Sequence, residues 1–326
     1  DAPSEPVMLG EKVPATITAK YYFGGPVAEG RIKYKVLRYS HTAQWYPPMY
    51  WDWYYGPGYW WFAYDYDWYP GWKGWGSCCP RPWWVHWREP RPEIVMENEG
   101  PIAPDGTVKI EVDTGLAKAV MGHTDHRYEI SAEVTDLSRR TIVGQGSVLV
   151  ARKPFKVHTW VDRGHYRVGD SVEASVAALT LDNKPVTGTG VLRLMKIAYD
   201  KDGKPVETEA QKWNLDPNPE GRARQQIKAS QAGQYRLSYT LKDVKGHEIE
   251  GGYIFCIAGQ GFDSSQFRFN DLELVADQSE YKPQQNLRLM INTNRAGGTV
   301  VLFPRPANGV CREAKVIRLK GKSAIE

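Results

Sequence analysis

Two phrases of the chain occur twice, and this repetition constrains the fold more than any other feature of the sequence. Residues 10–27 (GEKVPATITAKYYFGGPV) align without a gap on residues 169–186 (GDSVEASVAALTLDNKPV), with shared Gly, Val, Ala and Pro-Val positions. Residues 128–144 (YEISAEVTDLSRRTIVG) align in the same way on residues 235–251 (YRLSYTLKDVKGHEIEG). Because the two phrases keep their order along the chain, the sequence predicts successive copies of one structural unit.

The repeated phrases have the pattern of β-strands. In residues 128–135, Tyr, Ile, Ala and Val alternate with Glu, Ser and Thr, and residues 235–241 alternate in the same way. A period of two in short runs between Gly, Asp and Asn turns predicts antiparallel sheets with one solvated face. One short helix is predicted at residues 113–122, with Asp113 or Thr114 as its cap and Gly122 at its end. The predicted fold class is therefore all-β, with tandem antiparallel β-sandwiches of the immunoglobulin- or fibronectin-like kind.

A third copy begins late in the chain. Residues 277–291 (DQSEYKPQQNLRLMI) align on residues 162–176 (DRGHYRVGDSVEASV), and about half a unit follows. The chain therefore has the pattern of a piece of a longer protein. The expected domains are a first sandwich at 1–153, a second at 154–258, a linker at 259–269 and a partial third sandwich at 270–326.

An aromatic-rich stretch interrupts the first unit. Eleven of the thirteen tryptophans lie between Trp45 and Trp87, and prolines and glycines divide them every few residues, so no long helix can carry them. Without the stretch at about residues 41–92, the first unit has the size of the second. We therefore expect an insertion between the second and third strands of the first unit, since lengthening a connection costs little closure entropy.

Three uses of this insertion compete. It packs as a satellite core on its own sandwich, it contacts a neighbouring domain, another copy or the cell envelope, or it stacks the sugars of a glycan or peptidoglycan. So much aromatic area would aggregate if it were left exposed, which favours packing or a permanent interface. The candidate interface residues are Trp51, Trp53, Trp60, Trp61, Trp68 and Trp72.

The four cysteines have no metal-type spacing. The sequence leaves a disulfide or a thiol open for each of Cys78, Cys79, Cys256 and Cys311, and the adjacent pair Cys78 and Cys79 would form a strained bridge if joined to each other. Cys256 lies in the predicted closing strand of the second unit, and a buried thiol is favoured there.

No catalytic, cofactor-binding or metal-binding constellation is found, so neither an enzyme nor a cofactor is predicted. His123, Asp125 and His126 lie close together, but they lack H-E-x-x-H spacing and a third ligand. We expect them in a solvated loop. Ser147 is outside any G-x-S-x-G elbow. The net charge of +4 comes from Lys and Arg scattered among acids, which argues against nucleic-acid binding, and no apolar run is long enough to span a membrane.

Several phrases of the chain resemble the macroglobulin-like domains of the alpha-2-macroglobulin family, specifically its bacterial members. These phrases are residues 19–27 (AKYYFGGPV), 128–144, 153–172 (KPFKVHTWVDRGHYRVGDSV) and 277–289 (DQSEYKPQQNLRL). In that family, Tyr-x-x-Gly after a D-R or D-Q pair opens a domain, and the third copy departs from this pattern with Gln284 at the glycine position.

The resemblance implies a protease trap. In such proteins a ring of domains holds a bait segment, cleavage of the bait closes the scaffold, and an internal thioester often captures the protease. The thioester needs a Cys-Gly-Glu-Gln run, whereas Cys256 is followed by Ile-Ala-Gly-Gln and Cys311 by no glutamine. The resemblance therefore implies a thioester-free, non-catalytic scaffold portion of a broad-spectrum protease inhibitor.

The implied partners are other domains of the same longer chain, target proteases met through the parent protein, and further copies in a homo-oligomer. The implied location is the periplasm, the cell surface or the medium. The alternative function is a cell-surface adhesion or peptidoglycan-binding module that uses the aromatic insertion.

Overall fold

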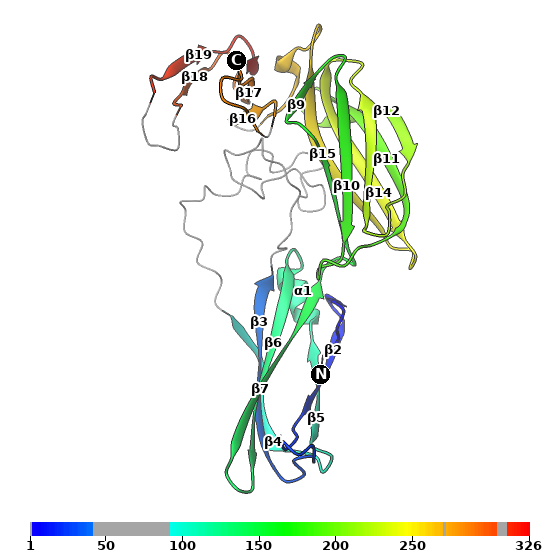
Figure 1. Ribbon diagram of the computed structural model, residues 1–326, viewed down its shortest axis with the longest axis vertical. Helices are drawn as coiled ribbons and strands as arrows, with labels where there is room; N and C mark the ends of the chain where they lie inside the picture. The colour runs from blue at the N-terminus through cyan, green and yellow to red at the C-terminus, as the bar shows by residue number, and fades with distance from the viewer. Residues whose placement is uncertain (1, 42–91, 270–271, 279, 305–311) are drawn as a thin grey trace. The chain divides into compact units, whose positions relative to one another are not determined.

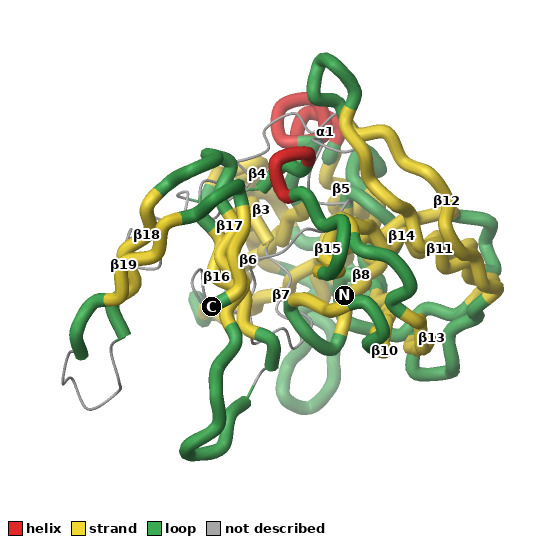
Figure 2. The backbone as a smooth tube through the Cα atoms, turned by 90° about the horizontal axis from the view of Figure 1, so that it is seen from above, coloured by secondary structure: helices red, strands yellow, loops and turns green. Residues whose placement is uncertain are grey.

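The structure, a computed structural model, describes residues 2–41, 92–269, 272–278, 280–304 and 312–326. The chain is all-β and divides into two compact units (Figure 1). Figure 2 shows how little of the backbone is helical. No helix among the described residues is both long and apolar enough to cross a membrane.

The first unit packs a five-stranded sheet against a two-stranded sheet. The larger sheet has the order β1-β7-β6-β3-β4 and contains β1 (Val7–Met8), β3 (Gly30–His41), β4 (Glu93–Pro101), β6 (Asp125–Asp136) and β7 (Thr141–Ala151). The smaller sheet pairs β2 (Lys12–Thr18) with β5 (Thr107–Asp113). The inward-facing side chains of both sheets form one buried apolar cluster. The alternation in the sequence therefore assigns the buried face correctly.

The predicted helix is confirmed as α1 (Gly115–Met121), and Gly122 is its C-cap. Asp113 Oδ1 accepts the Gly115 N–H at 2.7 Å. The Thr114 hydroxyl makes no capping bond and binds the start of the chain instead, because it accepts the Gly10 N–H at 2.8 Å and donates to the Glu11 carbonyl at 2.6 Å.

The second unit begins with a sandwich of the same design. Its five-stranded sheet has the order β12-β11-β14-β15-β9 and contains β9 (His165–Arg167), β11 (Gly188–Tyr199), β12 (Pro205–Asn214), β14 (Gly233–Asp243) and β15 (Glu248–Ala258). Its smaller sheet has the order β13-β10-β8 and contains β8 (Lys156–Val161), β10 (Ser171–Leu179) and β13 (Arg222–Lys228).

The repeated phrases occupy equivalent strands. β2 and β10 carry the first phrase, and β6 and β14 carry the second. The same backbone bond occurs at the end of each first-phrase strand: the Ala19 N–H donates to the Gly106 carbonyl and the Ala178 N–H to the Gly221 carbonyl, both at 2.8 Å. These two glycines have φ of +71° and +70°, and a Cβ on either would approach the partner carbonyl oxygen to about 2.5 Å. Both copies therefore require glycine for the same steric reason.

The residue range that holds the predicted insertion, 42–91, lies outside the described residues. It separates β3 from β4, which pair antiparallel, with Arg38 opposite Glu93. The equivalent strands of the second unit, β11 and β12, are joined by a short turn that the Asp200 N–H closes on the Lys204 carbonyl at 3.0 Å.

The remainder of the second unit forms two small sheets. One has the order β16-β17-β20 and the other pairs β18 with β19; they contain β16 (Glu273–Ala276), β17 (Leu289–Asn292), β18 (Thr299–Leu302), β19 (Lys315–Arg318) and β20 (Ser323–Ile325). A 3-10 turn, η1 (Ser264–Gln266), precedes them. A compact apolar core holds Leu274, Leu289, Ile291, Ile317 and Leu319.

Candidate functional site

Most of the sequence-predicted site residues lie outside the described part of the chain. They are the six interface tryptophans Trp51, Trp53, Trp60, Trp61, Trp68 and Trp72, together with Cys78, Cys79 and Cys311. The structure places one of the predicted cysteines, Cys256.

Cys256 is a buried free thiol in β15. It stands opposite Gln234 of β14 on one side and His165 of β9 on the other, and it packs in an apolar cluster with Phe267, Phe269 and Met290. Burial raises the pKa of the Cys256 thiol far above its usual range, with a smaller contribution from the Glu273 carboxylate. This cysteine is therefore a packing residue without nucleophilic character.

The prediction of a solvated loop for the His123 cluster is wrong for two of its three residues. His123 lies exposed in a turn, but Asp125 and His126 begin β6 and are 4 % and 0 % exposed. The phrase contains charged and polar residues, which suggested solvent, whereas pairing of β6 with β3 and β7 draws its start into the interior.

Asp125 anchors the end of the first sandwich. Its Oδ1 accepts the Arg152 N–H at 2.9 Å, and its Oδ2 lies 2.9 Å from the Lys156 ammonium. These contacts tie the segment that follows β7 to the start of β6. No group of metal-ligating side chains occurs among the residues that the structure describes.

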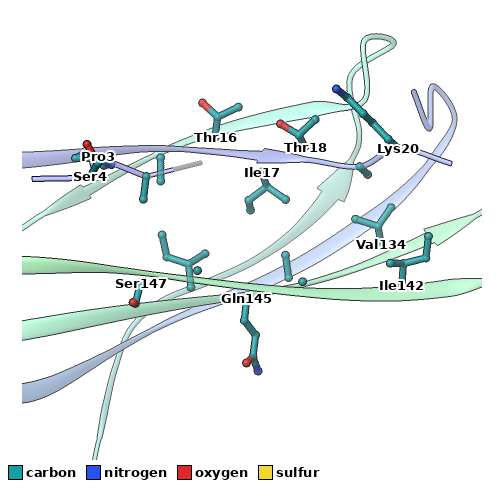
Figure 3. Close-up of a pocket in the computed structure, with 17 residues that line it drawn as sticks. Pro3, Ser4, Thr16, Ile17, Thr18, Lys20, Val134, Ile142, Gln145 and Ser147 are labelled. Atoms are coloured by element: carbon teal, nitrogen blue, oxygen red, sulfur yellow. The ribbon is translucent and has the colours of Figure 1, made fainter. Parts of the chain in front are cut away.

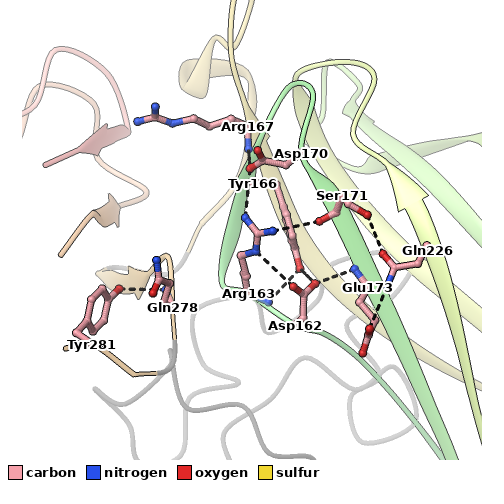
Figure 4. Close-up of polar contacts among 10 residues, drawn as sticks. All are labelled: Asp162, Arg163, Tyr166, Arg167, Asp170, Ser171, Glu173, Gln226, Gln278 and Tyr281. Atoms are coloured by element: carbon pink, nitrogen blue, oxygen red, sulfur yellow. Dashed lines mark hydrogen bonds and ion pairs between the residues drawn. The ribbon is translucent and has the colours of Figure 1, made fainter. Parts of the chain in front are cut away.

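A turn stabilised by one tyrosine and one aspartate follows β8, the first strand of the second sandwich (Figure 4). The Tyr166 hydroxyl donates to Asp162 Oδ1 at 2.6 Å and accepts the Arg163 N–H at 3.0 Å. The same carboxylate oxygen accepts the Glu173 N–H at 2.7 Å. Asp170 Oδ2 accepts the Arg167 N–H at 2.9 Å. Burial raises the pKa of the Tyr166 phenol, so it stays a neutral donor at every physiological pH.

The third copy repeats this turn bond for bond. The Tyr281 hydroxyl donates to Asp277 Oδ1 at 2.5 Å. It also accepts the Gln278 N–H at 3.0 Å (Figure 4). The Arg288 N–H points to the same carboxylate oxygen at 3.3 Å. Gln284 keeps the left-handed backbone of Gly169, with φ of +69° against +99°. The sequence pointed to this phrase, while the reason for its Tyr and Asp is visible only in the structure.

A groove with a mixed polar and apolar lining opens on the first sandwich between β2 and the pair β6 and β7, with a volume of about 570 Å³. Ile17 points into it from β2, and Val134 and Ile142 face it from the opposite sheet (Figure 3). Pro3 and Ser4 lie at one end, next to β2. The sequence did not predict this groove. It accompanies a difference in the number of described strands between the two smaller sheets, and that difference is visible only in the structure.

A charge network around the buried Arg236 lies on the second sandwich. Arg236 of β14 binds both carboxylate oxygens of Glu207 at 2.8 Å, and it also contacts Glu250. Ser238 donates to Glu250 at 2.7 Å. Each charge has a partner of opposite sign, so the network is satisfied and serves the sheet rather than a reaction.

No family model matches the chain, and no curated protein matches it. Among solved structures, the chain is similar over its whole length to Escherichia coli alpha-2-macroglobulin in its native conformation, with a TM-score of 0.33 and 12 % identity. It is similar to trypsin-activated alpha-2-macroglobulin from E. coli with a TM-score of 0.37 and 12 % identity, and to Salmonella alpha-2-macroglobulin reacted with methylamine with 0.34 and 11 %. The chain covers 20 %, 23 % and 20 % of these three chains, about a fifth of their length.

Proposed function

We propose that this chain is a non-catalytic scaffold portion of a bacterial alpha-2-macroglobulin-like protein that traps proteases. The observation that carries the proposal is the turn built on Asp162 and Tyr166 and repeated on Asp277 and Tyr281. This turn follows the first strand of two successive copies, β8 and β16, and its phrase is the one that resembles the domain opener of that family.

The proposed organisation is a string of macroglobulin-like domains at 1–153, 154–258 and 270–326, joined by a linker at 259–269. Continuous apolar cores suit units that move as stiff bodies. Such bodies transmit the cleavage of a bait segment elsewhere in the parent protein into a movement of the scaffold. Target proteases would be met outside the cytoplasm, in the periplasm, at the cell surface or in the medium.

The aromatic-rich stretch at 42–91 is proposed as the contact surface of this scaffold with a neighbouring domain or a second copy. The composition supports this assignment, because aromatic side chains offer large contact areas at a low cost in conformational entropy. The proposed contact residues remain Trp51, Trp53, Trp60, Trp61, Trp68 and Trp72.

The test of the trap requires the complete parent protein. It is treated with trypsin, and the remaining activity is measured on a small chromogenic peptide and on a large protein substrate. A trap leaves cleavage of the small peptide intact and suppresses cleavage of the large substrate. Equal activity on both substrates, together with the absence of further sandwich units and of a bait segment beyond Glu326, would overturn the proposal.

A second measurement separates the trap from the adhesion module. The variant with Trp51, Trp53, Trp60 and Trp61 changed to alanine is compared with the parent in binding to purified peptidoglycan. Its folding is checked by circular dichroism. If the parent binds peptidoglycan and the folded variant does not, the aromatic-rich stretch is an adhesion module and not a contact surface of the scaffold.

A further inference from the structure

The helix α1 of the first sandwich presents apolar side chains to solvent. Ala117 of this helix packs into the core, whereas Leu116 and Val120 are 73 % and 63 % exposed. These two residues are four positions apart, so they lie side by side on one face of the helix. A solvated helix face is ordinarily polar, and a helix that is apolar on most sides is ordinarily covered. The exposed face of α1 therefore has the composition of a contact surface.

The one charged residue of α1 lies on another side of the helix. Because a helix has about 3.6 residues per turn, Lys118 lies opposite Leu116 and Val120. A Cβ on Gly10 would lie 2.6 Å from Lys118 Cδ, so the lysine stem covers the backbone at Gly10. The apolar face is thus free of charge and faces away from this contact.

Both attachment points of the aromatic-rich stretch lie beside the end of α1. Ser40, the second-last residue of β3, pairs with His126, and His126 Nε2 lies 3.2 Å from the Met121 carbonyl oxygen. Glu93, the first residue of β4, binds Arg38, and Arg38 Nη2 lies 3.5 Å from Met121 Sδ. Figure 1 shows α1 at the end of the first unit where β3 ends. Both ends of the stretch therefore join the sandwich next to α1.

We propose that Leu116 and Val120 form a docking surface whose occupant is the aromatic-rich stretch, residues 42–91. The tryptophan and tyrosine rings of the stretch supply apolar area to cover this face. The two short attachments hold these rings beside α1 at an effective concentration in roughly the millimolar range. One part of the stretch is thereby fixed to its own sandwich, and the remainder is left for a partner. This anchoring is the same in a trap scaffold and in an adhesion module.

A second exposed apolar pair of the first sandwich lies away from the attachment points. Leu137 and Val143 are 74 % and 61 % exposed, close to the values of the α1 pair. They flank the turn between β6 and β7, whereas the attachment points lie at the first residues of β6. This pair is therefore a matched control for the α1 face.

The test measures tryptophan emission, because eleven of the thirteen tryptophans lie in the stretch. The double variant Leu116→Gln and Val120→Gln keeps the helix propensity of α1 and removes its apolar face. Its emission is expected to shift to longer wavelength than that of the parent, with stronger quenching by acrylamide, because docked rings become exposed to water. The control variant Leu137→Gln and Val143→Gln is expected to keep the emission of the parent. Circular dichroism and urea unfolding verify that both variants fold.

A shortened chain tests the same contact from the side of the helix. Residues 42–91 are replaced by a copy of residues 200–204 (DKDGK), the turn that joins the equivalent strands of the second sandwich. Amide hydrogen exchange in peptides of α1 is expected to be roughly tenfold faster than in the parent. Adding Leu116→Gln and Val120→Gln to the shortened chain is expected to change the exchange no further, since the occupant is already gone.

Three results would overturn the proposal. The first is an unchanged emission of the folded α1 variant, or an equal shift in its control. The second is exchange of α1 in the shortened chain at the rate of the parent, because the stretch would then not cover the helix. The third is a shift of the parent emission on dilution that matches the shift of the α1 variant, because the occupant would then be a second copy of the chain.

Discussion

The Tyr166 hydroxyl and the Asp162 carboxylate are joined by a 2.6 Å hydrogen bond across four residues, directly after the first strand of the second sandwich. The same carboxylate oxygen accepts the Glu173 N–H, so one side chain closes the turn and fixes the first residues of β10. Tyr281 and Asp277 are joined in the same way at 2.5 Å. A phrase that marks a domain start in the sequence is therefore a small hydrogen-bonded clamp.

Removal of this bond is expected to destabilise the second sandwich. Tyr166→Phe leaves the Arg163 N–H without its acceptor and Asp162 with one donor fewer, so a loss of about 1–3 kcal/mol in the free energy of unfolding is expected. Tyr22→Phe is the matched control, since Tyr22 is fully exposed. Urea unfolding of both variants measures the difference. An equal effect of the two changes would contradict the clamp.

Gln284 carries backbone strain that glycine would relieve. A non-glycine residue at positive φ costs about 1–3 kcal/mol, whereas the greater freedom of glycine in the unfolded chain costs about 0.4–1 kcal/mol. The first effect is larger, so Gln284→Gly is expected to stabilise the third copy by roughly 1 kcal/mol.

The reciprocal change Gly169→Gln is the control for this argument. A Cβ on Gly169 would meet nothing within 4 Å, so its expected loss of stability comes from the backbone alone. In both variants, the stability of each turn is measured by amide hydrogen exchange in the peptides that contain it. A loss of stability in the Gln284→Gly variant would contradict the prediction, because it would show that contacts of the glutamine side chain stabilise the turn.

The sequence predicted the strands, their faces and the repeat because these depend on local patterns. The alternation around Tyr128 and Tyr235 assigns the buried side correctly, and both tyrosines lie inside their sandwiches at 1 % and 3 % exposure. Sequence reasoning even predicted the helix that begins at Gly115 and its end at Gly122, since caps are short-range signals.

Features that depend on distant partners were missed or misjudged. Asp125 and His126 have a polar sequence context, and only their pairing in β6 buries them. The groove on the first sandwich depends on the absence of a third strand beside β2 in the described residues, which no local pattern reports. Gln284 was noted as a departure, but its retained positive φ is a property of the fold.

Acid is expected to destabilise the chain through two of the three histidines that are buried among the described residues. Burial lowers the pKa of His126 and of His165 below the value of about 6.5 for the unfolded chain. The unfolded state then binds more protons below that pH, so this stability is present above about pH 6.5 and is lost as the pH falls.

The slope is measured by urea unfolding between pH 5 and pH 8. Each histidine contributes at most about 1.4 kcal/mol per pH unit. The double variant His126→Gln and His165→Gln is expected to reduce the slope, and the part that remains includes His41, whose pKa burial also lowers. His123→Gln is the control, because His123 lies exposed in a turn, and it should nearly keep the slope of the parent. A parent profile that is already flat across this range would contradict the prediction.

Cys256 is expected to resist alkylation in the folded protein. Burial keeps its thiol protonated and out of reach of reagent, whereas unfolding restores an ordinary thiol. The experiment uses the variant in which Cys78, Cys79 and Cys311 are serine, so that iodoacetamide labelling reports Cys256 alone. Labelling should be slow without urea and rapid above the unfolding midpoint. Equal rates in both conditions would show that β15 opens readily.

Two glycines at equivalent positions are expected to respond in opposite ways to the same substitution. Gly251→Ala sets a Cβ at 2.2 Å from the Val157 backbone oxygen, and no side-chain rotation relieves a clash with backbone. The expected loss is about 3 kcal/mol, the upper part of the range for overpacking. Gly144→Ala meets open space and restricts the unfolded chain, so an effect between neutral and a gain of about 1 kcal/mol is expected. Urea unfolding, followed by hydrogen exchange in peptides of β7 and β15, separates the two sandwiches. Similar losses at both glycines would mean that the face of β7 is covered as the face of β15 is, and that the two copies are equal after all.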